Sequence, residues 1–99
     1  ADSKVLLAEM GEARRRAHLE LARISEAPHD HPWRDKAEEA MNSLIERMSA
    51  NYHDLEKAMA DRVDLSRKAL RRWSKETRAT LDHLAELRAN WSSVAKATA

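Results

Sequence analysis

Apolar residues recur at helical spacing from Trp33 to Val94, and neither Gly nor Pro interrupts this stretch. At 100° per residue, the residues that define the pattern fall within a sector of about 120°. They are Trp33, Ala37, Met41, Ile45, Met48, Tyr52, Leu55, Met59, Val63, Leu70, Trp73, Leu81, Leu84 and Trp91. A loop inside the stretch would reset the phase, and unrelated halves would realign only about one time in three. The pattern therefore predicts one long helix over residues 33–95, or two helices in phase.

A shorter amphipathic helix is expected over residues 3–26. Its apolar face is formed at spacings of three and four by Leu6, Met10, Ala13, Ala17, Leu21 and Ile24. Asp2 or Ser3 can cap its first turn, and Pro28 ends it because the residue before a proline avoids helical geometry. The Pro- and His-containing segment 27–32 is then a short turn, which favours an antiparallel helical hairpin.

The two expected helices differ in length, about 36 Å against about 93 Å at 1.5 Å per residue. The first helix would cover the second only as far as about residue 58, leaving the rest of the apolar row without a partner inside the chain. We expect the partner interface to consist of Met59, Val63, Leu70, Trp73, Leu81, Leu84 and Trp91.

Two architectures would cover this row. In the favoured one, two hairpins form a coiled-coil-like dimer through their long second helices. In the alternative, the chain breaks near residues 60–66 and closes into a compact three-helix bundle, with Asp61, Asp64 or Ser66 as the cap of a third helix. The dimer of long helices is favoured because residues 60–66 contain neither Gly nor Pro, the residues that usually mark a turn.

Composition fits a single all-α domain over residues 1–99. Of the 42% hydrophobic residues, 18 are Ala, which leaves 24 larger side chains for narrow helix–helix seams. Sheets are excluded because β-branched and aromatic residues are sparse. No apolar run approaches the ~20 residues that span a bilayer. The absence of Cys does not locate the protein, and a soluble chain in the cytoplasm is the favoured expectation.

Charge is unevenly distributed along the chain. Residues 20–64 hold 11 acidic and 6 basic residues, a balance of −5, whereas residues 65–99 hold 3 acidic and 8 basic residues, a balance of +5. In a three-helix bundle the acidic middle helix would lie beside the basic last helix. The basic residues Arg67, Arg71, Lys75 and Arg78 span only about 80° of a helix surface, enough to follow a phosphate backbone.

Metal-binding chemistry is limited to the turn, where His29 and His31 flank an aspartate. Two imidazoles and a carboxylate suit zinc, copper or nickel, so a metal-responsive sensor is one alternative function. A solvated turn is the favoured interpretation. Helical metal sites place a Glu three residues before a His, but the positions three residues before His18, His53 and His83 hold Arg15, Ala50 and Thr80.

The favoured function is a non-enzymatic helical interaction or assembly module that self-associates as a homodimer through its long helix. A nucleic-acid-associated protein that uses the basic face 67–78 is the main alternative. The methionines of the apolar row could also receive a partner helix. No cofactor is expected, since the chain has neither a Gly-rich phosphate loop nor a nucleophile motif.

Overall fold

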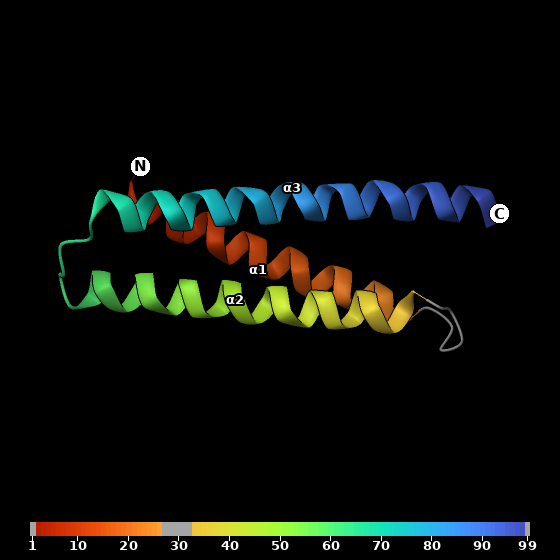
Figure 1. The fold of residues 1–99 in the computed structure, drawn as a ribbon, viewed down its shortest axis with the longest axis horizontal. Helices are drawn as coiled ribbons and strands as arrows, with labels where there is room; N and C mark the ends of the chain where they lie inside the picture. The colour runs from red at the N-terminus through yellow and green to blue at the C-terminus, as the bar shows by residue number, and fades with distance from the viewer. Residues whose placement is uncertain (1, 27–32, 99) are drawn as a thin grey trace.

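In the computed structural model, the described residues of this chain form three α-helices: α1 (Ser3–Ser25), α2 (Arg34–Ala60) and α3 (Arg67–Thr98) (Figure 1). The structure describes residues 2–26 and 33–98, and side chains as far as Asn90. The helices lie along the long axis of a body that measures 51 × 20 × 17 Å. The all-α class is confirmed, and of the two expected architectures the chain adopts the compact three-helix bundle.

The uninterrupted helix expected over residues 33–95 is wrong, because the chain turns at residues 61–66. The turn is a Schellman motif, in which Arg62 N–H donates to the Met59 carbonyl (3.2 Å) and Val63 N–H donates to the Ala58 carbonyl (2.9 Å). Arg62 occupies the left-handed position with φ of 55°, where glycine is usual. An arginine at this position gives no Gly signal, so the sequence pattern did not reveal the turn.

The starts of α1 and α3 are capped as expected, whereas Trp33 at the start of α2 makes no side-chain cap hydrogen bond. Asp2 Oδ1 accepts a hydrogen bond from Lys4 N–H at 2.9 Å, which caps α1. Ser66 Oγ accepts from Ala69 N–H at 3.1 Å and caps α3, so one of the three cap candidates is confirmed. The Pro/His turn expected over residues 27–32 lies outside the described residues.

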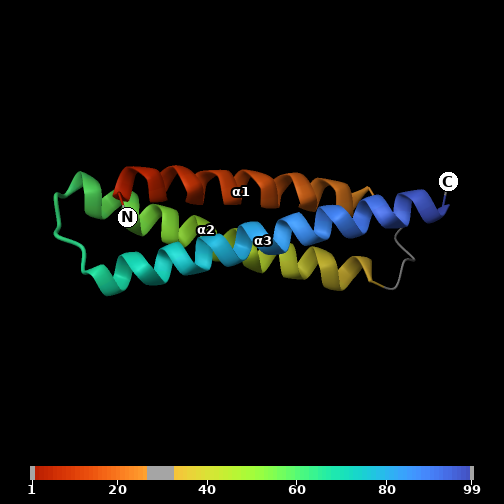
Figure 2. The same ribbon diagram turned by 90° about the horizontal axis from the view of Figure 1, so that it is seen from above.

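Helix α1 lies in the groove between α2 and α3 (Figures 1 and 2). It runs antiparallel to α2 and parallel to α3 (Figure 1). Its contacts with α2 are the most extensive, those with α3 are fewer, and α2 and α3 contact each other least. Helix α1, which was expected to pack only against the second helix, therefore packs against α3 as well.

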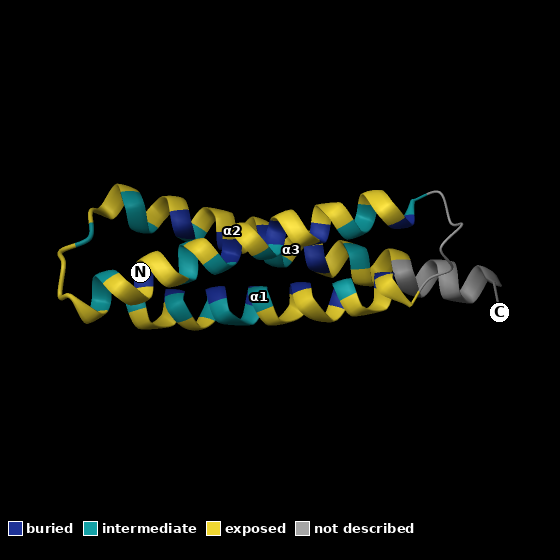
Figure 3. Ribbon diagram, turned by 90° about the horizontal axis from the view of Figure 1, so that it is seen from below, coloured by how far each residue is buried: buried dark blue, intermediate teal, exposed yellow. Residues whose placement is uncertain are grey.

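Buried residues recur along all three helices (Figure 3). They form two clusters, one near each end. One cluster consists of Leu6, Met10, Leu55 and Trp73. The other consists of Ala17, Ile24, Met41, Leu44 and Leu84. The apolar face predicted for the first helix is confirmed, since five of its six residues are buried and Leu21 packs against the second cluster.

Two buried polar residues, Thr77 and Arg34, make hydrogen bonds to backbone carbonyls. The fully buried Thr77 hydroxyl donates to the Trp73 carbonyl at 2.7 Å, one turn back along α3. This bond lets a threonine occupy a core position. The mostly buried Arg34 donates from Nη2 to the Ser25 carbonyl at 3.3 Å, and its Nη1 lies 3.5 Å from the Glu38 carboxylate. Arg34 thereby joins the end of α1 to the start of α2.

Gly11 of α1 lies next to Tyr52 of α2. A Cβ atom added there would lie 3.4 Å from Tyr52 Cε2, an ordinary contact distance. Because glycine inside a helix costs about 0.5–1 kcal/mol relative to alanine, Gly11→Ala should stabilise the fold by about that amount. The expected rise in melting temperature is about 2–8 °C by circular dichroism.

Ala8→Gly on the exposed surface of α1 is the matched control. It makes the opposite exchange away from Tyr52, so its melting temperature should fall by a similar amount. A lower melting temperature for Gly11→Ala would show that α1 and α2 lie too close together for a methyl group.

Candidate functional site

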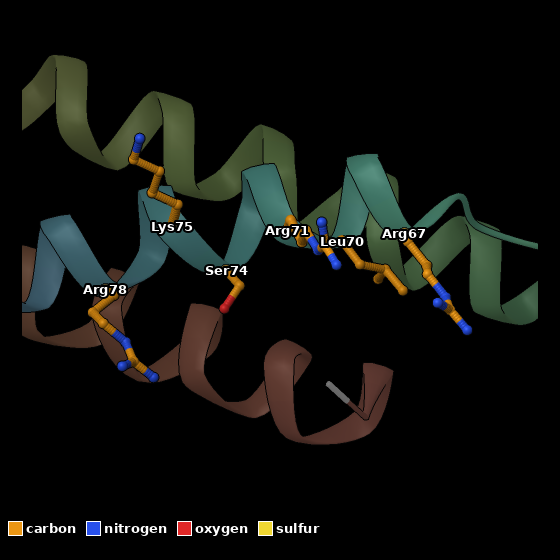
Figure 4. A pocket seen from close by; sticks show the side chains of 6 residues that line it. All are labelled: Arg67, Leu70, Arg71, Ser74, Lys75 and Arg78. Carbon is orange, nitrogen blue, oxygen red and sulfur yellow. The ribbon is translucent and has the colours of Figure 1, made fainter.

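Four basic side chains share one exposed face of α3, near the end of the bundle where the chain turns from α2 into α3. They are Arg67, Arg71, Lys75 and Arg78, the residues that the sequence grouped on one arc (Figure 4). Leu70 and Ser74 complete the lining of a trough between them. Since all six residues belong to one helix, the trough is an open surface for an extended partner and not an enclosed site for a small molecule.

None of the four cations has an ion-pair partner within the described part of the chain. The arginines of α1 differ in this respect. Glu12 Oε2 accepts a hydrogen bond from Arg15 Nε at 2.9 Å, and Glu12 Oε1 accepts one from Arg16 Nε at 2.9 Å. Hydrogen bonds from Arg15 and then Arg16 lower the pKa of Glu12 from 4.5 to about 2. The positive charge of α1 is thus partly neutralised, whereas that of the α3 face is not.

The acidic block of the chain does not neutralise this face, contrary to the charge pairing expected for a three-helix bundle. Helices α2 and α3 have the fewest mutual contacts, and Asn51 Nδ2 of α2 donates at 2.7 Å to the Glu76 carboxylate of α3. Four acidic residues, Asp35, Glu38, Glu39 and Glu46, lie in the first half of α2, whereas Asp54 and Glu56 lie in its second half and make no ion pair with the four cations within the described chain. Because α2 and α3 are antiparallel, the first half of α2 lies toward the far end of the bundle from Arg67 (Figure 1).

The apolar row expected to form a partner interface lies largely inside the bundle. Trp73 and Leu84 are buried in the two core clusters, and Met59, Leu70 and Leu81 are half-buried. The inference that nothing in the chain covers this row is wrong, because α1 packs against α3. Two further members complete the set: Val63 in the turn is 57% exposed, and the side chain of Trp91 lies outside the described residues.

The remaining candidate chemistry is placed as follows. His29 and His31 lie outside the described residues, and elsewhere in the described chain no group of three or more His, Asp or Glu could hold a metal ion. Trp73 packs in the core and therefore offers no open ring for base stacking. Met41 and Met48 are buried, and Met48 contributes to the lining of a shallow groove between α2 and α3.

Two features of the site were missed from the sequence. Ser74 and Leu70 line the trough; helical spacing from Arg71 and Arg78 would have placed Ser74 beside the arc, whereas Leu70 lies about 60° outside it, on the side of the apolar row. Arg14 of α1 lies over the Tyr52 ring, 4.6 Å from its centroid. That contact depends on the register between α1 and α2, which no local pattern reports.

Comparisons with known protein families, curated proteins and solved structures find no match to this chain. Within the residues that the structure describes, none of the helices combines the length and apolar character needed to cross a membrane. The site therefore has to be interpreted from its own geometry and charge.

The cluster around Glu12 predicts a measurable pKa. In the wild type, the Glu12 pKa measured by NMR titration should be about 2, and Arg15→Gln should raise it toward 4.5 because the main hydrogen-bond donor is lost. A carboxyl pKa that is lower in the folded state than in the unfolded chain stabilises the fold at pH values above the unfolded-state pKa. This stabilisation is lost as the pH falls from about 4.5 toward 2.

Arg14→Gln provides the control, because it removes a neighbouring charge that donates no hydrogen bond to Glu12. It should leave the Glu12 pKa close to that of the wild type. An ordinary Glu12 pKa in the wild type would contradict the claim that α1 neutralises its own arginines.

Proposed function

We propose that this protein is a non-enzymatic helical module that binds nucleic acid through the basic face of α3. The observation that carries the proposal is the set of four exposed cations, Arg67, Arg71, Lys75 and Arg78, without ion-pair partners in the described chain. Unpaired cations on one face create a local positive field, even though the formal charge of the whole chain is only +1.

The dimensions of the face suit a phosphate backbone. Residues 67–78 cover about 16 Å of helix axis, a length over which one strand of a duplex carries about five phosphates. Four cations spaced along that length can each contact one phosphate. Arginine can also bind a phosphate through two parallel hydrogen bonds, which favours nucleic acid over a partner with isolated carboxylates.

The proposed contact is independent of base sequence. Phosphate contacts position a protein on nucleic acid, whereas sequence is read by side chains that reach base edges. Trp73, the tryptophan next to the basic face in sequence, lies in the core and leaves the cations to supply the affinity. The expected interaction is therefore electrostatic, with micromolar affinity at low salt and weaker binding at high salt.

Self-association of closed bundles through the apolar row is not the function favoured by this geometry. Trp73 and Leu84 pack against α1 in the closed bundle, so an interface built on them would require the bundle to open. The basic face needs no rearrangement to reach a partner.

Binding to a short fluorescently labelled DNA duplex tests the proposal by anisotropy across a series of salt concentrations. Four phosphate contacts predict a slope of log K against log salt of about −3.6. Arg71→Gln/Lys75→Gln removes two contacts and should reduce the slope to about −1.8, with weaker binding at every salt concentration. Glutamine keeps high helix propensity, so the fold should be retained.

Lys36→Gln/Lys57→Gln removes the same charge from exposed positions of α2 and serves as the matched control. It should leave the slope near −3.6. Equal losses in the two variants would show a dependence on net charge alone and would contradict a site on α3. Absence of duplex binding at low salt, or binding to an acidic protein instead, would also reject the proposal.

A further inference from the structure

The turn between α2 and α3 resembles a closed hinge more than a fixed boundary. Its left-handed position holds Arg62, with φ of 55°, where a side chain is strained and glycine would not be. Neither Gly nor Pro occurs between Trp33 and the end of α3, so no residue there is incompatible with a continuous helix. The apolar row also keeps its phase through the turn, as it would in one helix.

If this hinge opened, a second copy of the chain could restore most of the contacts that would be lost. Helix α3 packs mainly on α1 and has few contacts with α2, its neighbour in sequence. If residues 61–66 straightened, α3 would leave its own α1 but could occupy the same groove on a second chain. Trp73 and Leu84 would then meet the same core residues as in the closed bundle, contributed by the partner.

We propose that two copies of this chain exchange α3 and form an antiparallel dimer with one continuous helix over residues 34–98 in each chain. Each half of the dimer is a three-helix bundle with α1 and α2 from one chain and α3 from the other. Antiparallel α2 and α3 in the closed bundle give the geometry directly, because two straight antiparallel helices place the α2 half of each beside the α3 half of the other (Figure 1).

The residues near the hinge supply the contact that is new in the dimer. Met59, Val63 and Leu70 fall on one face of a continuous helix and lie where the two long helices cross. In the closed bundle Met59 and Leu70 are only half-buried and Val63 is 57% exposed. Exchange would bury this face against its copy and relieve the strained Arg62 in both chains. The basic face 67–78 stays outward in either form, so this proposal does not depend on nucleic-acid binding.

Sedimentation equilibrium after refolding from urea, from micromolar to millimolar protein, tests the exchange with two opposing variants. Arg62→Gly fits the left-handed turn and disfavours a continuous helix, so it should weaken dimerisation at least tenfold. Ser66→Ala removes the cap that only the closed form needs and should strengthen dimerisation about tenfold. Circular dichroism checks that both variants stay folded.

Cross-linking identifies which chain supplies α3, and the absence of native Cys makes it direct. Asn51 and Glu76, hydrogen-bonded between α2 and α3, are replaced by Cys and joined with a short bis-maleimide. In the exchanged dimer the link joins two chains and gives a covalent dimer on a denaturing gel. The control pair Arg14→Cys/Tyr52→Cys joins α1 to α2 and should give a monomer band in either form.

Solution scattering adds a third criterion, because a continuous helix over residues 34–98 is about 97 Å long whereas the closed bundle extends 51 Å. A monomer of 11.3 kDa at every concentration, for the wild type and Ser66→Ala alike, would overturn the proposal. A dimer in which the Asn51–Glu76 pair cross-links only within a chain would overturn it as well, since that dimer would consist of closed bundles.

Discussion

The packing of α1 against two helices at once is the constraint on which the structure depends. A helix buries apolar surface along a stripe, and 24 large apolar side chains in 99 residues give little material for a third seam. Helix α1 uses one buried stripe to serve both neighbours, with Leu6 and Met10 in the cluster that holds Trp73, and Ala17 and Ile24 in the cluster that holds Leu84. The seam between α2 and α3 is correspondingly sparse.

Properties that depend on local spacing could be predicted from the sequence. The face of α1, the caps at Asp2 and Ser66, and the exposed arc from Arg67 to Arg78 follow from helical periodicity and short-range hydrogen bonds. The turn at Arg62 could not be predicted in this way, because an arginine in a left-handed position looks in sequence like any helical residue. Sequence phase favoured the longer helix, and tertiary packing on α1 favoured the turn.

The state of the basic face also depends on tertiary arrangement. Spacing alone placed four cations on one arc, but whether an acidic neighbour neutralises them depends on which helices touch. The sequence suggested that the acidic second helix would lie against the basic third. Because α2 and α3 have few contacts, and because none of the four cations forms an ion pair within the described chain, the basic face keeps its charge for an external partner.

The small number of contacts between α2 and α3 bears on both nucleic-acid binding and the exchange of α3, although neither proposal requires the other. Few contacts between α2 and α3 leave the cations without a neutralising helix, and the same lack of contacts lowers the cost of moving α3 away from α2. The core residues of α3 lie on its inner face, and the cations lie on an exposed one. Exchange of α3 would change the chain that supplies the inner contacts and leave the outer face open. An exchanged dimer would therefore carry two basic faces, one toward each side of its crossing point.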